Sequence, residues 1–565
     1  MQYASVLLFN AVVLTLDGND AVASALALDG DRILAVGDRD GLAPLIGPDT
    51  ECRDMGGAAV LPGFYDAHGH ILMAAQGRGR VNLNSPPLGT CRTLGDILAA
   101  IRARAAETPE GEWVLACGLD DTLLTEKRFP SRWELDEAAP HNPVFAQHIS
   151  GHLCALNSAA LKLAGIDRHT PDPAGGIIRR DADGEPDGVL EESPVYETIM
   201  PLLPTQTREQ RIDDLAATTR DYAARGITTA VDAALFSYDD AELLRTVQEQ
   251  GRLAVRVHVN PFTSLDPDDP RLAFDGKDVT IGGVKLLADG SLQGYTGYLT
   301  KPYHTPYQGD PEWRGYPTHS RENLFALVEA AHGRGQFLIH TNGDAATDDA
   351  LDALEAAQAK HPRKDCRHIL IHAQTIREEQ LDRLGAAGYT PSFFTAHVYY
   401  WGDRHRDLFL GPERAARMDP MRSALDRGLV ITAHCDSPIV PADPLLSIWV
   451  SVNRLTSSGQ VLGPDQRISV LEALRAHTFN PAWQNFQENA KGSIEPGKLA
   501  AEAELREGDI ILSANLKPIK SVEEFSKIIR EDAKKRGVVM LQLQRQGQTF
   551  FRSLALSDTP DGAKK

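Results

Sequence analysis

The chain of 565 residues has the length of three or four ordinary domains, or of one large barrel with attachments. Hydrophobic residues make up 42% and charged residues 24%, which excludes disordered, collagen-like and coiled-coil classes. The 78 acidic side chains outnumber the 58 basic ones and give a formal charge of -20, so neither nucleic acid nor an anionic membrane surface is expected as a partner.

Residues 1–57 carry two alternating apolar runs, VLLFNAVVLTLD and ALALDGDRILAVG, with Asp-Gly turn signals. This pattern predicts antiparallel strands and a small N-terminal β sandwich. The first apolar stretch has no basic flank and no cleavage site, and no apolar run is long enough to span a bilayer, so we expect neither a signal peptide nor a membrane helix. Six cysteines without CxxC spacing are typical of a reducing compartment and predict a cytoplasmic protein.

From residue 58 onward, short β-rich runs alternate with segments of helical periodicity. Eight such runs occur, at 58–68, 226–234, 253–260, 279–290, 336–344, 368–374, 390–397 and 429–436. Eight strands with helices between them predict an α/β fold, a (β/α)8 TIM barrel, over residues 58–497. The first two runs are too far apart for a single crossover, which predicts an inserted subdomain at about 75–215.

Polar residues occur where a buried parallel strand should be apolar, near the C-terminal ends at which a TIM barrel carries its active site. They are His68, His70, Lys285, His340, His372 and Asp436. His68 and His70 are two residues apart on a predicted strand and would point the same way, and imidazole and carboxylate groups are ligands that zinc prefers. We therefore predict one shared metal site. The alternative is that the HxH pair consists of surface or hydrogen-bonded loop histidines.

Lys285 is one of only eight lysines before residue 498. An ammonium group inside a barrel strand is costly unless it is paired or chemically changed. A carbamate formed with carbon dioxide would convert the lysine into a carboxylate able to bridge two cations. The alternative is a lysine whose head group pairs with Asp289.

Several strings carry a resemblance to a known family: LPGFYDAHGH, VKLLADGS, HTNGDAATDDALDALE, IHAQ, CDSPIVPADPLLSI and GSIEPGKLA. Together they resemble the amidohydrolase superfamily, and within it the amidohydrolase-3, YtcJ-like branch that includes N-substituted formamide deformylases. The resemblance covers residues 1 to about 500. It implies a (β/α)8 barrel, a small β sandwich built from both chain ends, and a metal centre at the barrel mouth, usually zinc, with one or two ions or another divalent metal.

The resemblance also implies a role for each predicted ligand. His68 and His70 would bind a first metal, Lys285 as a carbamate would bridge, His340 and His372 would bind a second metal, and Asp436 would bind metal and move protons. The implied reaction is hydrolysis of the C–N bond of a small-molecule amide, with an acyl group as small as formyl. A metal lowers the pKa of bound water to around 7, and Asp436 would take the proton and return it to the leaving amine.

The insertion contains candidate substrate-binding residues, and the sixth run departs from the family pattern at one position. His152 and Asn157, in HISGHLCALNSAAL, match a motif of the family, and we predict that they contact substrate; a structural loop role for His152 is the alternative. We expect Asp120 and Asp121 to cap a turn or face solvent, with binding of a substrate amine as the alternative. The acidic residue that the family usually has before the sixth-strand histidine is Ile371 here, which weakens a supporting contact and removes no predicted ligand.

An aromatic and polar cluster follows the seventh run. His397, Tyr399 and Trp401, in AHVYYWGDRH, would line the substrate pocket at the predicted mouth. Core packing of at least two of the rings is an alternative, and His397 as an extra metal ligand is another.

The C-terminal segment 498–565 contains as many lysines as all of residues 1–497. It resembles the later part of a PDZ domain of the kind attached to HtrA-type serine proteases, with a strand (GDIILSAN), a helix (VEEFSKIIREDAKK) and a hairpin (VVMLQLQRQGQTFFRSLAL). PDZ domains bind peptides beside a carboxylate-binding loop, and that loop precedes the part that is matched. We therefore expect a partial PDZ-like α+β tail without a working peptide groove, which leaves the N-terminal sheet edges exposed unless the tail covers them.

The favoured function is metal-dependent hydrolysis of a small amide or N-substituted formamide, by an enzyme for which a homodimer is one expectation. One alternative keeps the barrel and changes the substrate to a cyclic amide, a carbamate or an ester, because specificity resides in the insertion and loops. The other alternative is a non-catalytic regulatory protein that uses the PDZ-like tail for partners. The presence of all six candidate ligands argues against this non-catalytic alternative.

Overall fold

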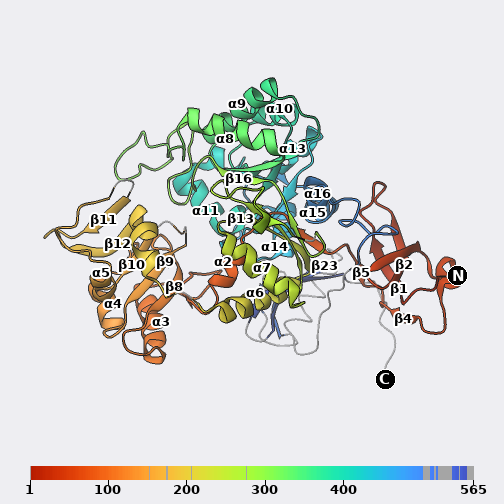
Figure 1. Cartoon of the computed structure of the whole chain (residues 1–565), viewed down its shortest axis with the longest axis horizontal. Coiled ribbons are helices and arrows are strands. Elements are labelled where there is room, and N and C mark those ends of the chain that lie inside the picture. Colours follow the sequence, from red (N-terminus) through yellow and green to blue (C-terminus); the bar gives the residue numbers. More distant parts are fainter. Residues whose placement is uncertain are drawn as a thin grey trace.

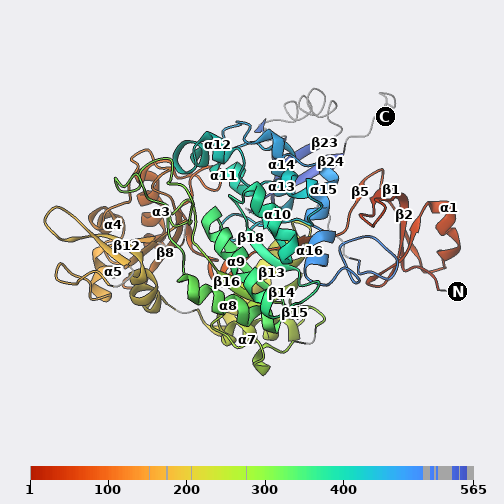
Figure 2. The same cartoon turned by 90° about the horizontal axis from the view of Figure 1, so that it is seen from above.

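The computed structural model describes residues 2–149, 151, 153–173, 176–204, 206–274 and 276–500, and in the C-terminal segment 510–514, 517–518, 538–545 and 548–555. Figure 1 shows three parts along the long axis: an orange-to-yellow subdomain, a central body of strands and helices, and a red N-terminal sheet. The perpendicular view keeps this order (Figure 2). The central body therefore separates the two smaller parts.

The N-terminal part is a sheet of order β3-β2-β1-β4, in which β5 also pairs with β1. Its elements are β1 (Val6–Leu14), β2 (Val22–Asp29), β3 (Arg32–Gly37), α1 (Arg39–Leu42), β4 (Glu51–Asp54) and β5 (Ala59–Val60). The β1–β2 and β2–β3 pairs are antiparallel, whereas β4 and β5 are parallel to β1. The prediction of antiparallel strands over residues 1–57 is confirmed for β1–β3 and wrong for β4, because the segment containing α1 crosses the sheet and brings the chain back in the same direction.

The β3 edge of this sheet pairs with residues from much later in the chain. Arg32 forms an antiparallel bridge with Leu499, and the Ile33 amide donates to the Lys498 carbonyl at 2.9 Å. This returning segment covers part of the strand edge that would otherwise present unpaired backbone groups. The N-terminal sheet is thus built from both ends of residues 1–500.

The central body contains two sheets of parallel strands, ordered β15-β14-β13-β6 and β16-β17-β18-β19-β20. Their bounds are β6 (Phe64–Asp66), β13 (Ile227–Leu235), β14 (Arg256–Pro261), β15 (Val279–Ile281), β16 (Val284–Leu287), β17 (Phe337–Thr341), β18 (His368–His372), β19 (Tyr389–Phe393) and β20 (Thr432–Ala433). The sheets meet at both edges: Phe262 bridges to Lys285, and the Asp436 amide donates to the His68 carbonyl at 3.0 Å. Each of the eight predicted runs contributes a strand to this body.

Seven of the eight predicted runs are longer than the strands that they form, and two of the runs are divided. The run 279–290 forms β15 and β16, which are separated by Gly282 and Gly283. A Cβ on Gly282 would lie 2.3 Å from His258 Nε2, and one on Gly283 would lie 2.3 Å from the Gln336 carbonyl oxygen. Neighbouring strands therefore leave room only for glycine there, and the strand is interrupted. The run 58–68 divides between β5, in the N-terminal sheet, and β6.

Helices pack against these strands where the periodicity predicts them. They are α2 (Ile71–Gln76), α6 (Arg208–Ala223), α7 (Tyr238–Glu249), α8 (Arg321–Arg334), α9 (Asp344–Lys360), α10 (Glu378–Ala387), α11 (Ala396–Arg404), α12 (Pro412–Ala415), α13 (Met421–Asp426), α14 (Pro444–Asn453), α15 (Val470–Ala476) and α16 (Phe479–Gln484). Gly388 ends α10 in the left-handed conformation with φ 90°, as its terminal position predicts. Leu354 and Leu384 on the helices and Phe337 and Leu370 on the strands belong to one apolar core.

The subdomain between α2 and α6 has its own six-stranded sheet, ordered β11-β12-β10-β9-β8-β7. Its elements are β7 (Val81–Asn82), α3 (Leu94–Glu107), β8 (Val114–Leu119), α4 (Arg132–Ala138), β9 (Val144–His148), β10 (Leu153–Leu156), α5 (Ser158–Leu163), β11 (Gly176–Arg180) and β12 (Pro186–Glu192). Ile97, Val114 and Leu135 form part of a separate apolar core. This sheet lies within the stretch 75–215.

The C-terminal segment contains a small antiparallel sheet of order β22-β21-β23-β24. Its strands are β21 (Ile510–Ala514), β22 (Lys517–Pro518), β23 (Val538–Arg545) and β24 (Gln548–Ala555). The expected strand and hairpin are present, and the expected helix 522–535 lies outside the described residues. None of the helices in the described ranges is long and apolar enough to cross a lipid bilayer.

Candidate metal centre

Three imidazoles surround one carboxylate just beyond the C-terminal ends of the strands. The Nε2 atoms of His68 and His70 each lie 3.5 Å from Asp436 Oδ1, and His372 Nε2 lies 3.8 Å from Asp436 Oδ2. Asp436 is buried, and its Oδ1 accepts no hydrogen bond. Two sets of potential ligand atoms therefore share Asp436, each set lying within 4.8 Å: His68, His70 and Asp436, and His372, His434 and Asp436.

His68 and His70 reach the cluster from a turn, whereas the sequence predicts them on a strand. Strand β6 ends at Asp66, and His70 directly precedes α2 with φ -134° and ψ 73°. The Asp436 amide donates to the His68 carbonyl at 3.0 Å, and the His70 amide donates to the Ser437 carbonyl at 2.7 Å. The two imidazoles converge because backbone bonds hold this turn against the segment that follows β20, and not through the two-residue period of a strand.

His340, at the end of β17, lies beside these two sets. Its ring centroid is 4.7 Å from that of His372. Its Nδ1 lies 3.3 Å from Asp289 Oδ1, and its Nε2 lies 3.2 Å from Asn342 Nδ2. A carboxylate facing Nδ1 favours the tautomer with its proton there, which leaves the lone pair on Nε2. The structure thus places His340 next to the centre with Nε2 engaged by the Asn342 amide.

Asp289 also organises the loop beside the centre. Its side chain is 0% exposed and accepts from the backbone amides of Tyr298, Asn342 and Gly343 at 3.0, 2.9 and 2.7 Å. Removing the carboxylate would leave three buried donors unpaired, each of which costs free energy because neither water nor protein replaces the lost partner.

We expect Asp289→Ala to lower the free energy of unfolding by about 3–5 kcal/mol. Asp31→Ala is the matched control, since the Asp31 side chain is 69% exposed, and its effect should stay within about 0.5 kcal/mol. Urea titration of both variants against the unmodified protein checks this, and equal stabilities of the two variants would contradict it.

Lys285 projects from β16 and is only 2% exposed. Burial lowers the pKa of its ammonium group, an effect partly offset by the Asp436 carboxylate. Burial likewise raises the pKa of Asp436, partly offset by Lys285. The alternative partner, Asp289, is engaged by backbone amides and His340. Lys285 therefore belongs electrostatically to the cluster around Asp436, and its surroundings favour the neutral amine.

The sequence analysis does not identify two polar residues of the cluster, His434 and Asp66. His434 is fully buried, with its ring centroid 4.9 Å from that of His68. Asp66 accepts from the Cys435 amide at 3.0 Å, and burial raises its pKa to about 7. His434 and Asp66 each precede a predicted ligand by two residues, in HCD and DAH. This is the spacing that singles out His68 and His70, and applying it again would have identified both.

Of the two insertion residues predicted to contact substrate, only Asn157 is described, and it lies outside the cluster. His152 lies outside the described residues. Asn157 is buried at the start of α5, where its side-chain oxygen accepts from the Ala160 and Val144 amides at 3.0 Å each and its Nδ2 donates to the Asn142 carbonyl at 2.8 Å. These bonds use its polar atoms to cap a helix and join strands, which favours a structural role for Asn157; its contact with substrate stays a prediction.

The aromatic and polar residues that follow β19 do not all lie in one place. His397 lies on α11, with its ring 5.8 Å from that of His372 and 5.9 Å from that of Trp401. Its Nδ1 is 3.7 Å from Asp419 Oδ1. Tyr399 packs instead with Tyr400 and a separate apolar cluster. His397 therefore lies next to the centre, whereas Trp401, which packs in an apolar cluster with Phe394 and Val440, and Tyr399 have core-packing roles.

Asp120 joins the insertion to α11. Its carboxylate accepts from Arg404 Nη1 at 2.9 Å and from the Thr122 amide and hydroxyl at 3.1 and 2.6 Å. Asp121 lies 3.4 Å from His148 Nε2. These contacts support the turn-capping role of Asp120, because they tie its carboxylate to the turn at Thr122 and to Arg404.

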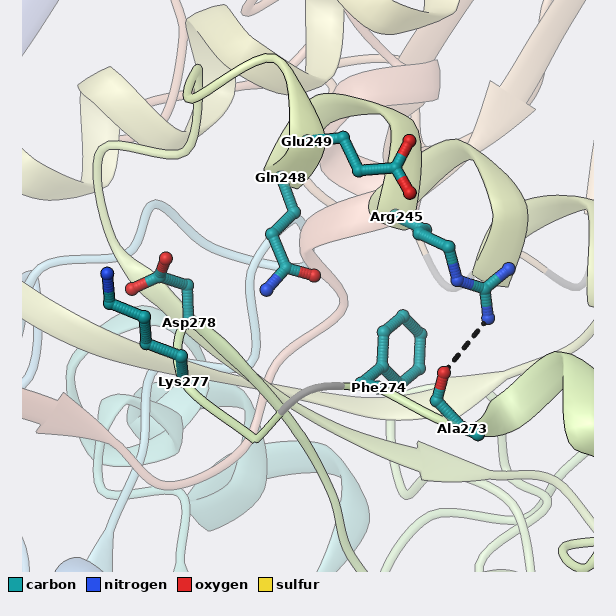
Figure 3. A pocket seen from close by; sticks show the side chains of 7 residues that line it. All are labelled: Arg245, Gln248, Glu249, Ala273, Phe274, Lys277 and Asp278. Carbon is teal, nitrogen blue, oxygen red and sulfur yellow. Dashed lines mark hydrogen bonds between the residues drawn. The ribbon is translucent and has the colours of Figure 1, made fainter.

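Two other features lie away from the centre. His332, Cys366 and His368 could hold a metal ion by spacing, but His332 bonds to His368 at 2.9 Å and to the His361 carbonyl at 2.9 Å, so its ring nitrogens are used. A pocket of about 270 Å³ (Figure 3) lies between the end of α7 and the segment before β15. It is lined by Arg245, Gln248, Glu249, Ala273, Phe274, Lys277 and Asp278 and shares no residue with the metal-site prediction.

Comparison with known proteins matches most of the chain to one family. The model of the amidohydrolase family matches residues 51–501, and a PDZ domain model matches residues 492–545. N-substituted formamide deformylase of Arthrobacter pascens is 31% identical over 517 residues, which cover 88% of this chain and 93% of that protein. The putative amidohydrolase YtcJ of Bacillus subtilis (strain 168) is 30% identical, covering 83% of this chain and 90% of that protein.

A solved structure shows the same fold. The crystal structure of an uncharacterized metal-dependent hydrolase from Pyrococcus horikoshii OT3 superposes with a TM-score of 0.70 at 24% identity, covering 88% of this chain and 96% of that one. The family model covers well over half of the 565 residues, and the His–Asp cluster lies within that match. The chain therefore belongs to the amidohydrolase family of hydrolases.

Proposed function

We propose that this protein is a metal-dependent amidohydrolase that cleaves the C–N bond of a small amide, with N-substituted formamides as the leading substrate class. One observation carries the proposal: the Asp436 carboxylate is within 3.8 Å of the Nε2 atoms of His68, His70 and His372. The relative from Arthrobacter pascens, an N-substituted formamide deformylase at 31% identity, supports the substrate class.

We further propose that the two parallel sheets form one (β/α)8 barrel over residues 58–497, with β15 and β16 as halves of one strand. The bridge from Phe262 to Lys285 and the backbone bond from Asp436 to His68 support closure at the two edges. In such a barrel the C-terminal strand ends form the catalytic face, which is where the imidazoles and Asp436 meet.

The residues present suit a divalent cation. Imidazole nitrogens and a carboxylate oxygen are the donors that zinc takes in catalytic sites, and the buried, unbonded Oδ1 of Asp436 is an acceptor that a cation would satisfy. His68, His70 and Asp436 would hold the first ion. His372 and His340, the latter through the Nε2 lone pair that now accepts from Asn342, would hold a second, and a carboxylated Lys285 would bridge the two.

Carboxylation of Lys285 follows from its chemistry. A neutral amine attacks the carbon of carbon dioxide, an N–C bond forms, and one proton leaves, so that the product is a carbamate with a single negative charge. The buried position of Lys285 lowers the pKa of its ammonium group and favours the neutral amine that this reaction needs. Nearby imidazoles and a bound cation would stabilise the new negative charge.

In the proposed mechanism, Asp436 moves one proton twice. A divalent cation held at this position lowers the pKa of water to around 7 and polarises the amide carbonyl. The Asp436 carboxylate accepts the proton that the attacking water loses. When the C–N bond breaks, the same carboxyl group returns this proton to the leaving nitrogen. The products are a carboxylic acid, which is formate for a formamide, and an amine.

Metal removal tests the proposal. Dialysis against a chelator is expected to lower the rate of formate release from N-substituted formamides at least about a hundredfold, because the water is then no longer activated. Addition of Zn²⁺ or Mn²⁺ to the dialysed protein should restore the rate. Full activity in protein from which bound metal has been removed would contradict the metal-dependent mechanism.

A substrate panel tests the reaction class. N-substituted formamides, longer acyl amides, cyclic amides, carbamates and esters should be compared by kcat/KM with the same metal-loaded protein. The proposal predicts the highest value for a formamide or another linear amide. A higher kcat/KM for a cyclic amide, carbamate or ester would contradict the proposed substrate class. It would leave the proposed metal centre unaffected, since loops outside the centre determine specificity.

A further inference from the structure

A chain of three side chains runs from strand β19 to the metal centre. Ser392 Oγ lies 2.9 Å from His434 Nδ1, and His434 Nε2 lies 3.1 Å from His372 Nδ1. His372 Nε2, on the other side of its ring, faces Asp436 Oδ2 at 3.8 Å. All four residues are buried. His434 is therefore the only described side chain hydrogen-bonded to the outer nitrogen of His372.

Packing fixes the plane of the His434 ring. Phe394 stacks on it with a centroid distance of 5.4 Å and an interplanar angle of 19°, and the His68 ring lies at 4.9 Å on a tilted plane. The His434 amide donates to the Phe393 carbonyl at 3.1 Å, which extends the pairing of β20 with β19. The ring cannot swing without breaking these contacts, so its two nitrogens remain directed at Ser392 and His372.

The number of N–H groups on each ring determines which nitrogen donates each hydrogen bond between these side chains. A neutral imidazole carries one N–H, so each ring donates one hydrogen bond and accepts one. For His372 to offer a lone pair at Nε2, its proton must be on Nδ1 and point to His434 Nε2. His434 must then carry its own proton on Nδ1 and donate it to Ser392 Oγ. The opposite arrangement would put the His372 proton on Nε2, toward Asp436, where it would block coordination.

The same contacts decide against His434 as a ligand. Its spacing to His372 and Asp436 is compatible with coordination, but both of its nitrogens have hydrogen-bond partners, and ligation would require breaking the bond to His372. Histidine ligands usually donate their outer N–H to a carboxylate, carbonyl or water. Here a second imidazole occupies that place.

We propose that His434 is a positioning residue, which with Ser392 holds His372 in the tautomer and orientation that bind a metal ion. This role rests on the proposed metal-dependent function. His434 and Ser392 would therefore strengthen metal binding although neither contacts the ion.

The test measures Zn²⁺ affinity by competition with a chromogenic chelator, without reference to activity. His434→Ala is expected to weaken Zn²⁺ binding about 10–100-fold, the usual cost of losing such a partner. Ser392→Ala should weaken it less, because His434 still accepts from His372. His434→Gln should recover most of the affinity, since its side-chain oxygen can accept from His372 Nδ1 while its amide donates to Ser392.

His332→Ala is the matched control, because His332 is also fully buried and bonds to another histidine, His368, at 2.9 Å outside the centre. It should leave Zn²⁺ affinity within about twofold. An unchanged affinity in His434→Ala, an equal loss in His332→Ala, or no recovery in His434→Gln would overturn the positioning role. If the unmodified protein binds no Zn²⁺, the proposed function fails and the positioning role with it; tight binding that His434→Ala does not change overturns only the positioning role.

Discussion

Asp436→Asn is expected to lower kcat for amide hydrolysis by about 10³-fold, because the variant loses the group that both accepts and returns the proton. The amide keeps the size of the side chain and one oxygen, so the fold should be retained. The carboxylate is also the ligand common to both sets of imidazoles, and the variant should therefore bind metal more weakly. Steady-state kinetics on an N-substituted formamide, with metal analysis of the same sample, measures both effects.

Asp232→Asn is the control for this substitution. Asp232 is 1% exposed and lies on β13, where its carboxylate accepts from the Leu72 amide at 3.0 Å, outside both ligand sets. It should change kcat by less than about tenfold. A similar loss of kcat in both variants would show that the effect arises from removing any buried charge, and would contradict the role of Asp436 in proton transfer.

Lys285→Ala is expected to reduce activity by about 10²-fold or more, because the second ion loses its bridging ligand. The variant leaves a space next to Asp436 where the carbamate would lie. Acetate or propionate should therefore restore part of the activity by supplying a carboxylate from solution. The dependence of kcat on the added acid measures the rescue, and metal content measured with and without the acid should rise in parallel.

Lys491→Ala provides the matched comparison. Lys491 is a second lysine whose pKa burial lowers, to about 8, and its ammonium group lies near Thr229 and Tyr65. It should retain activity and show no response to acetate. Full activity of Lys285→Ala, or a loss that no carboxylic acid relieves, would argue that Lys285 acts as an ammonium group and not as a carbamate.

The strand pattern predicts the central body well, because parallel strands buried on both faces give continuous apolar runs. The pattern cannot place the interruption at Gly282 and Gly283, which depends on how closely His258 and the Gln336 carbonyl approach. It also cannot give the direction of β4, which results from a crossover containing α1. The strand interruption and the direction of β4 both depend on contacts between residues that are far apart in the sequence.

The strand pattern also predicts why four of the candidate ligands lie close together. Polar residues at the ends of different parallel strands meet at one edge, and the structure brings His68, His70, His372 and Asp436 together there. The HCD spacing marks His434 as a polar residue of the cluster. The positioning role of Ser392 and His434 gives no such signal, because it depends on hydrogen bonds that cross between adjacent strands. Asn157 carries a different sequence signal: Asn before SAALKL is a helix N-cap pattern, and the structure uses it as one.

Anomalous diffraction from metal-loaded crystals at the zinc absorption edge locates a bound ion. The proposed metal centre predicts a peak about 2.0–2.2 Å from the Nε2 atoms of His68 and His70 and from a carboxylate oxygen of Asp436. A peak only at another place on the protein, or none in crystals whose dissolved protein contains stoichiometric zinc, would contradict it.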